Sequence, residues 1–244
     1  MDRLQLDKNA KLTGRVYFKD EVMWLGLSGS GASFTFDGTK LVLKLKGDNI
    51  AVGENPIDYA RIAVYVDGKR VVDEMIDCAE KEVTVIDRTE NAQSVVEIIK
   101  LSESPMSAVG VEAFAEGSAE ALPEKPLKIE FIGDSITCGY GVDDEDENHQ
   151  FTTATEDVTK AYAYKTAKAL DAEYSMFSAS GYGIVSGYTE GDEPISEQTI
   201  PQFYCSYGFS RGNFAGTAPQ DIPWDFSKYI PQIIVINLGT NDDS

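Results

Sequence analysis

Residues 127–137 read LKIEFIGDSIT, an apolar run that passes directly into Gly133, Asp134 and Ser135. The apolar part, residues 127–132, predicts a buried strand, and the residues after it predict a turn at the carboxyl end of that strand. A serine at such a turn is exposed and approachable, as a nucleophile must be. The alternative is that Asp134 and Ser135 only cap a following helix, which these residue types often do.

Two later segments follow the same pattern. Residues 173–178 predict a strand followed by small residues around Gly181, and residues 233–238 predict a very apolar strand followed by Asn241. An Ala-rich segment at about 159–170 predicts a helix. Alternating strands and helices indicate an α/β domain with a parallel sheet, whose ligand sites lie at the carboxyl ends of the strands. We expect residues 233–238 to be an interior strand with further neighbours, because the segment is apolar throughout.

The residues at these strand ends suit the stabilisation of negative charge. A glycine lets a backbone N–H approach a ligand oxygen closely, and an asparagine amide is a good donor to a developing oxyanion. Each motif alone also fits an ordinary tight turn. Three such motifs in order, at Ser135, Gly181 and Asn241, are less easily explained as turns only.

The first half of the chain has a different pattern. Residues 12–117 contain short β-type runs separated by turn residues, without helical periodicity. The expected strands cover residues 33–36, 41–46, 61–66, 70–75, 83–87, 95–100 and 109–115. The pairs Asp37-Gly38 and Asp67-Gly68 predict hairpin turns. This half is therefore predicted to be an all-β sandwich or jelly roll.

A segment rich in small residues and proline, residues 116–126, separates the two patterns and predicts a linker. The chain of 244 residues is long enough for two domains. We expect a β-sandwich (jelly-roll) domain over residues 1–120 and an α/β domain over residues 127–244.

The charge balance restricts the partners. The chain has 21 basic and 41 acidic residues, a formal net charge of −20, which repels nucleic acid and anionic membranes. We expect neither as a partner. The acidity suits a neutral substrate such as a sugar, or serves solubility alone. The N-terminus lacks a signal-peptide pattern, which indicates a soluble cytoplasmic protein, although a secreted protein whose signal had been removed would look the same.

Three widely separated cysteines, Cys78, Cys138 and Cys205, form neither a complete disulfide framework nor a metal-ligand pattern. We expect free, buried thiols. The serine chemistry indicated by Ser135 needs no metal or other cofactor, and we expect none.

Taken together, these residues resemble the SGNH (GDSL) hydrolase superfamily. Ser135 corresponds to the block I serine, Gly181 to the block II glycine and Asn241 to the block III asparagine. A β-sandwich before such a domain is similar to carbohydrate esterase family 2, the acetyl xylan esterases that deacetylate hemicelluloses. The likeness spans nearly the whole chain and includes residues 133–141 (GDSITCGYG) and 151–162.

The resemblance implies an α/β SGNH-hydrolase domain and a serine esterase that removes O-acetyl groups from xylan- or mannan-type poly- or oligosaccharides. Ser135 would attack the acetyl carbonyl. The N–H groups of Ser135 and Gly181 and the side chain of Asn241 would form the oxyanion hole, each donor contributing about 3 kcal/mol. Asp134 is expected to hold the turn, since an exposed carboxylate is a weak base at pH 7.

The general base is missing from this pattern. Family members supply a histidine from an Asp-x-x-His-like segment after block III, whereas the sequence given ends three residues after Asn241. Its one histidine, His149, lies in the acidic run 143–149, where neighbouring carboxylates favour the charged form. We therefore expect residues 1–244 to be part of a longer protein that carries the base, and to be inactive or nearly so alone.

Aromatic side chains near the strand ends are candidates for binding the sugar: Tyr140, Tyr182, Tyr188 and Trp224. Residues 202–213 either line the cleft or pack, and the sandwich either binds carbohydrate or positions the hydrolase domain.

Two other functions stay open. The missing histidine suggests a non-catalytic carbohydrate-binding protein. A GDSL lipase or other esterase shares the serine chemistry, but membrane-binding features are missing. The sequence does not predict the oligomeric state.

Overall fold

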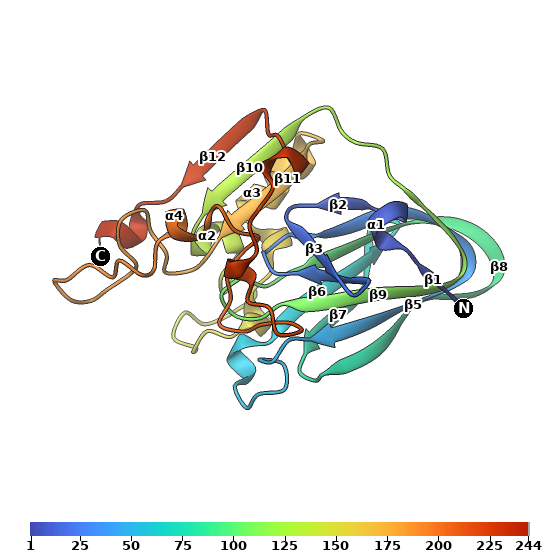
Figure 1. Cartoon of the computed structure of the whole chain (residues 1–244), viewed down its shortest axis with the longest axis horizontal. Coiled ribbons are helices and arrows are strands. Elements are labelled where there is room, and N and C mark those ends of the chain that lie inside the picture. The colour runs from blue at the N-terminus through green and yellow to red at the C-terminus, as the bar shows by residue number, and fades with distance from the viewer. Residues whose placement is uncertain (244) are drawn as a thin grey trace.

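An antiparallel sheet of nine strands makes up the first half of the chain, and a parallel sheet of three strands lies in the second half (Figure 1). The structure is a computed structural model that describes residues 1–243. The strands of the first sheet are β1 (Asp2–Leu4), β2 (Lys11–Thr13), β3 (Val16–Lys19), β4 (Val22–Leu25), β5 (Gly31–Gly47), β6 (Ala60–Val66), β7 (Lys69–Ile76), β8 (Glu80–Lys100) and β9 (Val109–Ala121). One helical turn, α1 (Leu6–Asn9), follows β1, and a 3-10 turn, Pro56–Asp58, precedes β6. We call this half the sandwich.

The long strands β5, β8 and β9 organise the sandwich. They lie within the strand order β3-β4-β9-β5-β8-β6-β7, in which β5 pairs with β9 on one side and β8 on the other. Phe34, Phe36 and the alternating Leu41, Leu43 and Leu45 of β5 are fully buried in its core. The predicted all-β half is confirmed, and its large antiparallel sheet is consistent with a jelly roll.

Two predicted turns had different outcomes. Asp67-Gly68 is a hairpin turn between β6 and β7, with φ of 51° and 78°, the positive values that a type I′ turn requires. Asp37-Gly38 is not a hairpin turn, because it lies inside β5 at a bulge between Gly38 and Lys40. A Cβ on Gly38 would lie 2.4 Å from the carbonyl oxygen of Glu116, so this glycine allows two backbones to approach closely. The predicted runs on either side of it are one strand.

The predicted linker over residues 116–126 also needs correction. Strand β9 continues to Ala121, and its last residues pair with β5, from Glu116 opposite Lys40 to Ala121 opposite Phe34. The connection to the parallel sheet is therefore residues 122–127. Small residues fit this strand because a neighbouring backbone approaches it closely at Gly117.

The parallel sheet has β10 (Lys128–Gly133) in the centre, β11 (Glu173–Ser178) on one side and β12 (Ile233–Asn237) on the other. Its helices are α2 (Ser135–Cys138), α3 (Tyr162–Ala169) and α4 (Ile200–Phe203). Short 3-10 turns cover Thr153–Thr155, Val158–Lys160, Pro219–Asp221, Phe226–Lys228 and Thr240–Asp243. The helix expected from residue 159 begins at Tyr162, because Ala161 is extended.

Strand β12 is an edge strand within residues 1–243, whereas its apolar sequence predicted an interior one. Ile233, Ile234 and Ile236 are 43%, 53% and 63% exposed. Ile236 also lines an apolar groove with Ile184, Ile200 and Leu238. The described helices are all too short or too polar to cross a bilayer.

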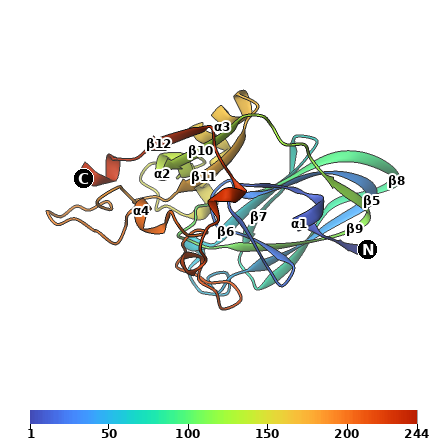
Figure 2. The same cartoon turned by 45° about the horizontal axis from the view of Figure 1, so that its top comes forward.

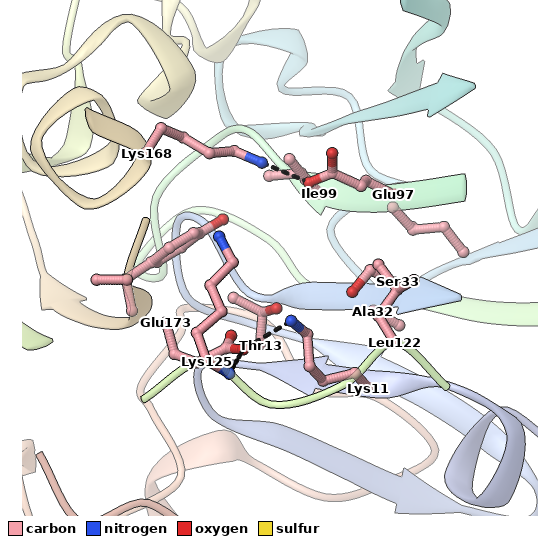
Figure 3. A pocket seen from close by; sticks show the side chains of 13 residues that line it. Lys11, Thr13, Ala32, Ser33, Glu97, Ile99, Leu122, Lys125, Lys168 and Glu173 are labelled. Atoms are coloured by element: carbon pink, nitrogen blue, oxygen red, sulfur yellow. Dashed lines mark hydrogen bonds and ion pairs between the residues drawn. The ribbon is translucent and has the colours of Figure 1, made fainter. Parts of the chain in front are cut away.

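Buried and half-buried ion pairs join the sandwich to the parallel sheet. Arg15 is fully buried, with its guanidinium 3.5 Å from Glu130 and donating to the carbonyl oxygen of Tyr204 at 2.6 Å. At the amino end of β11, Lys11 pairs with Glu173 at 2.6 Å, beside a pocket that Figure 3 shows. These contacts fix the position of the sheet against the sandwich.

Candidate active site

The serine turn, residues 133–138, leads from β10 into α2. Asp134 is the N-cap: its buried Oδ1 accepts the N–H of Ile136 at 3.1 Å, and burial raises its pKa. Ser135 is the first helical residue, and its N–H has no acceptor within residues 1–243. Gly133 is required here, because a Cβ would lie 1.9 Å from Oγ1 of Thr137. The turn thus both caps a helix and presents the serine.

The glycine turn, residues 179–183, follows β11. The N–H of Tyr182 donates to the carbonyl oxygen of Ala179 at 3.3 Å and closes a four-residue turn. Gly181 is its third residue and has φ of 79°, the value that a type II turn requires there. Within residues 1–243 the N–H of Gly181 makes no hydrogen bond, whereas its carbonyl oxygen accepts the N–H of Tyr188 at 2.8 Å. The turn therefore leaves one donor without an acceptor.

The asparagine turn, residues 238–242, follows β12. The side-chain amide of Asn241, 8% exposed, donates to the carbonyl oxygen of Tyr182 at 2.9 Å. The next residue, Asp242, accepts the N–H groups of Ile184, Val185 and Ser186 at 2.8, 2.6 and 3.1 Å. Partial burial opposes charge on Asp242, but these bonds outweigh it and lower its pKa. The asparagine turn thus holds the glycine turn and the loop after it.

Strand register places the three turns at one edge. Gly133 of β10 lies opposite Ser178 of β11 and Asn237 of β12, and neighbouring strands are about 4.8 Å apart. The arrowheads of β10 and β12 point toward α2 and the C-terminal helical turn (Figure 1), and Figure 2 shows this end of the molecule far from the N-terminus. The predicted convergence of the three strand ends is thereby observed, while the roles of their residues stay predictions.

A buried cluster of charged groups lies beneath the turns. Glu103, in the connection between β8 and β9, accepts the N–H of Ser180 at 2.6 Å. Its own N–H donates to Glu156 at 3.0 Å, and the cation of Lys100 interacts with both carboxyls. Burial is the main cause that raises the pKa of Glu103 and of Glu156 and lowers that of Lys100 to about 8.

Ligand atoms of Glu103, Cys138 and Glu156 lie within 4.8 Å of one another, a spacing that a metal ion accepts. The cluster already contains the cation of Lys100 and the Ser180 N–H, which supply its electrostatic balance. All three cysteines are free within residues 1–243, as predicted. Cys138 is buried, Cys78 is half-buried and Cys205 is exposed, so the expectation of buried thiols is confirmed for Cys138 and was wrong for Cys205.

The predicted sugar-binding tyrosines lie on or beside the turns. Tyr140 follows α2, is 46% exposed and stacks on Phe151 with ring centroids 3.8 Å apart. Tyr182 is part of the glycine turn and packs on Phe209, and Tyr188 is exposed beside Gly181. These positions suit contact with a ligand at the turns.

Trp224 and His149 lie elsewhere. Trp224 packs near the guanidinium of Arg15 and lines a groove with Tyr17 and Tyr229, none of which belongs to the three turns. The His149 side chain is 64% exposed, with Nδ1 2.8 Å from Oδ1 of Asp144. Within residues 1–243 no hydrogen bond joins it to Ser135. Residues 202–213 mainly pack: Phe203, Phe209 and Tyr207, for example, belong to apolar clusters.

Known proteins resemble this chain over most of its length. The family model described as the carbohydrate esterase 2 N-terminal domain matches residues 12–126. The cellulase/esterase CelE of Acetivibrio thermocellus is 33% identical over 220 residues, which cover 89% of this chain and 24% of that protein. The first half of this chain thus matches the N-terminal domain of carbohydrate esterase family 2, and nearly the whole chain is similar to solved carbohydrate esterases of family two.

Two further proteins resemble the chain over almost its whole length. The acetylxylan esterase / glucomannan deacetylase of Cellvibrio japonicus is 29% identical over 98% of this chain and 62% of its own length. A solved family two carbohydrate esterase from Clostridium thermocellum, in complex with cellohexaose, has a TM-score of 0.78 and 29% identity, covering 96% of this chain and 67% of that one. The chain spans less than two thirds of the two curated relatives.

Proposed function

We propose that this chain carries the nucleophile and the oxyanion hole of a serine esterase that removes O-acetyl groups from xylan- or mannan-type poly- or oligosaccharides. The observation that carries the proposal is the meeting of three parallel strand ends that bear Ser135, Gly181 and Asn241. In this proposal residues 127–243 are an SGNH-hydrolase domain that follows a jelly roll. The similar protein of Cellvibrio japonicus is an acetylxylan esterase / glucomannan deacetylase, which supports the substrate class.

The reaction uses the groups that the turns present. The hydroxyl oxygen of Ser135 bonds to the acetyl carbon, and the carbonyl oxygen becomes an oxyanion. Three donors would stabilise that charge by hydrogen bonds: the N–H groups of Ser135 and Gly181 and the side-chain amide of Asn241. The two N–H groups have no acceptor within residues 1–243. A general base takes the Ser135 proton and gives it to the sugar oxygen as the bond between that oxygen and the acetyl carbon breaks. Water then hydrolyses the acetyl-serine ester to acetate and restores the serine hydroxyl. Asp134 caps α2 and His149 bonds to Asp144, so neither is assigned as the base.

The surface around the turns suits a neutral sugar. Tyr140, Tyr182 and Tyr188 offer aromatic faces on which a pyranose ring can pack. The net charge of −20 does not attract anionic ligands but leaves the binding of neutral sugars unaffected. A relative solved with cellohexaose supports a β-linked oligosaccharide as ligand.

The test compares Ser135→Ala with Ser227→Ala, an exposed serine outside the turns, in the natural polypeptide that contains this chain. Hydrolysis of 4-nitrophenyl acetate and acetate release from acetylated xylan and mannan are measured. We expect Ser135→Ala to fall to near background and Ser227→Ala to match the parent protein. Undiminished hydrolysis by Ser135→Ala would refute the proposal. Binding of cellohexaose by a parent protein that releases no acetate would favour the carbohydrate-binding alternative.

A further inference from the structure

Glu103 connects the sandwich to two of the three turns that carry the proposed chemistry, the glycine turn and the serine turn. It belongs to the connection between β8 and β9 and is fully buried. One oxygen, Oε2, accepts the N–H of Ser180 in the glycine turn at 2.6 Å and lies 3.9 Å from the sulfur of Cys138 in α2. One carboxylate from the first half of the chain therefore lies beneath the glycine turn and the helix that Ser135 begins.

The backbone of Glu103 is fixed from both sides. Its N–H donates to Oε2 of Glu156 at 3.0 Å, and its carbonyl oxygen accepts Nζ of Lys100 at 3.0 Å. Lys100 also donates to the carbonyl oxygen of Ser102 at 2.7 Å. All of these side chains are fully buried, so the carboxylate has little freedom to move.

We propose that Glu103 is a positioning residue of the esterase reaction: its carboxylate fixes the glycine turn, and thereby the direction of the Gly181 N–H. The inference rests on the function proposed above. It assigns the sandwich a direct part in the site rather than a covering role.

The physical reason lies in the turn type. Ser180 and Gly181 are the two central residues of the turn, and the peptide between them carries the Gly181 N–H. Type I and type II turns differ mainly by rotation of this central peptide, so an unfixed turn can direct that N–H away from the oxyanion. The charge-assisted bond to the Ser180 N–H holds the preceding peptide, between Ala179 and Ser180, and so fixes the backbone from which the central peptide is directed. A displacement of about 1 Å can cost about 100-fold in rate.

A matched control lies at the other end of β11. Lys11 of β2 pairs with Glu173, the first residue of β11, and their charged groups are 2.6 Å apart. Figure 3 marks this contact with a dashed line. Both side chains are mostly buried. The Lys11 contact joins the sandwich to the first residue of β11, whereas Glu103 contacts the turn that follows the last residue of the same strand. Comparing the two contacts separates domain docking from turn positioning.

The experiment uses Glu103→Ala, Glu103→Gln and Lys11→Met, with two readouts. The first is kcat and KM for 4-nitrophenyl acetate in the natural polypeptide. We expect Glu103→Ala to lower kcat about 10- to 100-fold with KM changed less than about 2-fold. Glu103→Gln should regain most of this loss, because its amide oxygen still accepts the Ser180 N–H. Lys11→Met should lower the melting temperature but not kcat.

The second readout is amide hydrogen exchange of residues 179–183 in the chain of residues 1–244, which requires no catalysis. We expect faster exchange in Glu103→Ala and unchanged exchange in Lys11→Met. Unchanged exchange or unchanged kcat in Glu103→Ala overturns the inference, as does an equal loss of kcat in Lys11→Met. If Glu103→Ala does not fold, Glu103→Asp, which withdraws the carboxylate by one methylene, provides the same comparison.

The two proposals fail in different ways. If Ser135→Ala keeps full activity, the proposed function is wrong, and Glu103 has no catalytic part even where exchange shows that it holds the turn. If Ser135→Ala is inactive and Glu103→Ala is fully active, only the role of Glu103 is wrong.

Discussion

The side-chain amide of Asn241 donates to the carbonyl oxygen of Tyr182 at 2.9 Å, so the turn after β12 is bound directly to the turn after β11. Asn241 therefore has a structural role besides the donor role proposed for it. We expect Asn241→Ala to lower kcat about 100- to 1,000-fold, the loss typical of an oxyanion donor. The exposed Asn213→Ala is the control. A loss below about 3-fold in Asn241→Ala would show that the side chain takes no part in the reaction.

The carboxylate of Asp242 holds the loop that follows the glycine turn through three backbone N–H groups. We expect Asp242→Ala to free this loop and to speed proteolytic cleavage within residues 184–198. Asp243→Ala, an exposed neighbour, should leave cleavage unchanged. The measurement is limited proteolysis monitored by mass spectrometry, under conditions in which both variants have the same free energy of unfolding. Equal cleavage rates in the two variants would exclude the clamp.

The buried Arg15 is expected to contribute strongly to stability through Glu130. Replacing it by methionine leaves the carboxylate of Glu130 buried without its cation, which typically costs about 3–5 kcal/mol. Glu130→Gln in the Arg15→Met background should recover part of that loss. A double-mutant cycle measured by urea unfolding tests the coupling. The cycle compares Arg15→Met, Glu130→Gln and the double variant with the parent protein. If the loss in the double variant equals the sum of the two single losses, the ion pair carries no interaction energy.

Stability should also depend on pH through Glu156. Burial, followed by the charge of Glu103, raises the pKa of Glu156 well above its ordinary value of 4.5. Between the two values the folded protein holds a proton that the unfolded chain has lost, so the free energy of unfolding falls as pH rises. Glu156→Gln, which is neutral at every pH, should flatten this decline. Lys100 and Arg61 are the cations that oppose the shift.

The measurement is the urea midpoint between pH 5 and 7.5. The upper limit of pH 7.5 lies below the pKa of Lys100 in the folded protein, which is lowered from 10.5 to about 8, so that its titration adds little to the slope. Between pH 8 and 10.5 the unfolded chain keeps a proton on Lys100 that the folded protein has lost, so this group makes the free energy of unfolding rise with pH in that range. A Glu156→Gln protein with the same pH slope as the parent would contradict the prediction.

Local sequence patterns predicted most of the strands correctly. The strand expected over residues 173–178 has those bounds in the structure, because its apolar residues all face buried surroundings. The pattern failed at Asp37-Gly38 and Glu116–Ala121, where pairing between distant strands overrides turn and linker propensity. Asp67-Gly68 formed the turn that its residues predict, and the bonds between Asp67 and Val95 of β8 are compatible with that turn.

The residues of the candidate site also form two groups, those that the local pattern predicted and those that only long-range contacts bring to the site. Ser135, Gly181 and Asn241 stand immediately after apolar strands, so the local pattern predicted their place. Glu103 lies 77 positions from Ser180, and nothing in its surrounding sequence indicates that contact. Asp242 follows a residue that the pattern identified, but its three backbone partners depend on the tertiary fold. Residues that join the site through long-range contacts cannot be found from the local pattern of the sequence.

The Glu103–Ser180 bond has a consequence for engineering. Domains that are joined only by a flexible linker can in principle fold alone, so one of them can be exchanged without change to the other. Here a carboxylate from the first half of the chain sits inside the second half. A chimera that joins residues 128–243 to an unrelated module leaves the Ser180 N–H without its acceptor. The exchangeable unit in this protein is the sandwich and the parallel sheet together.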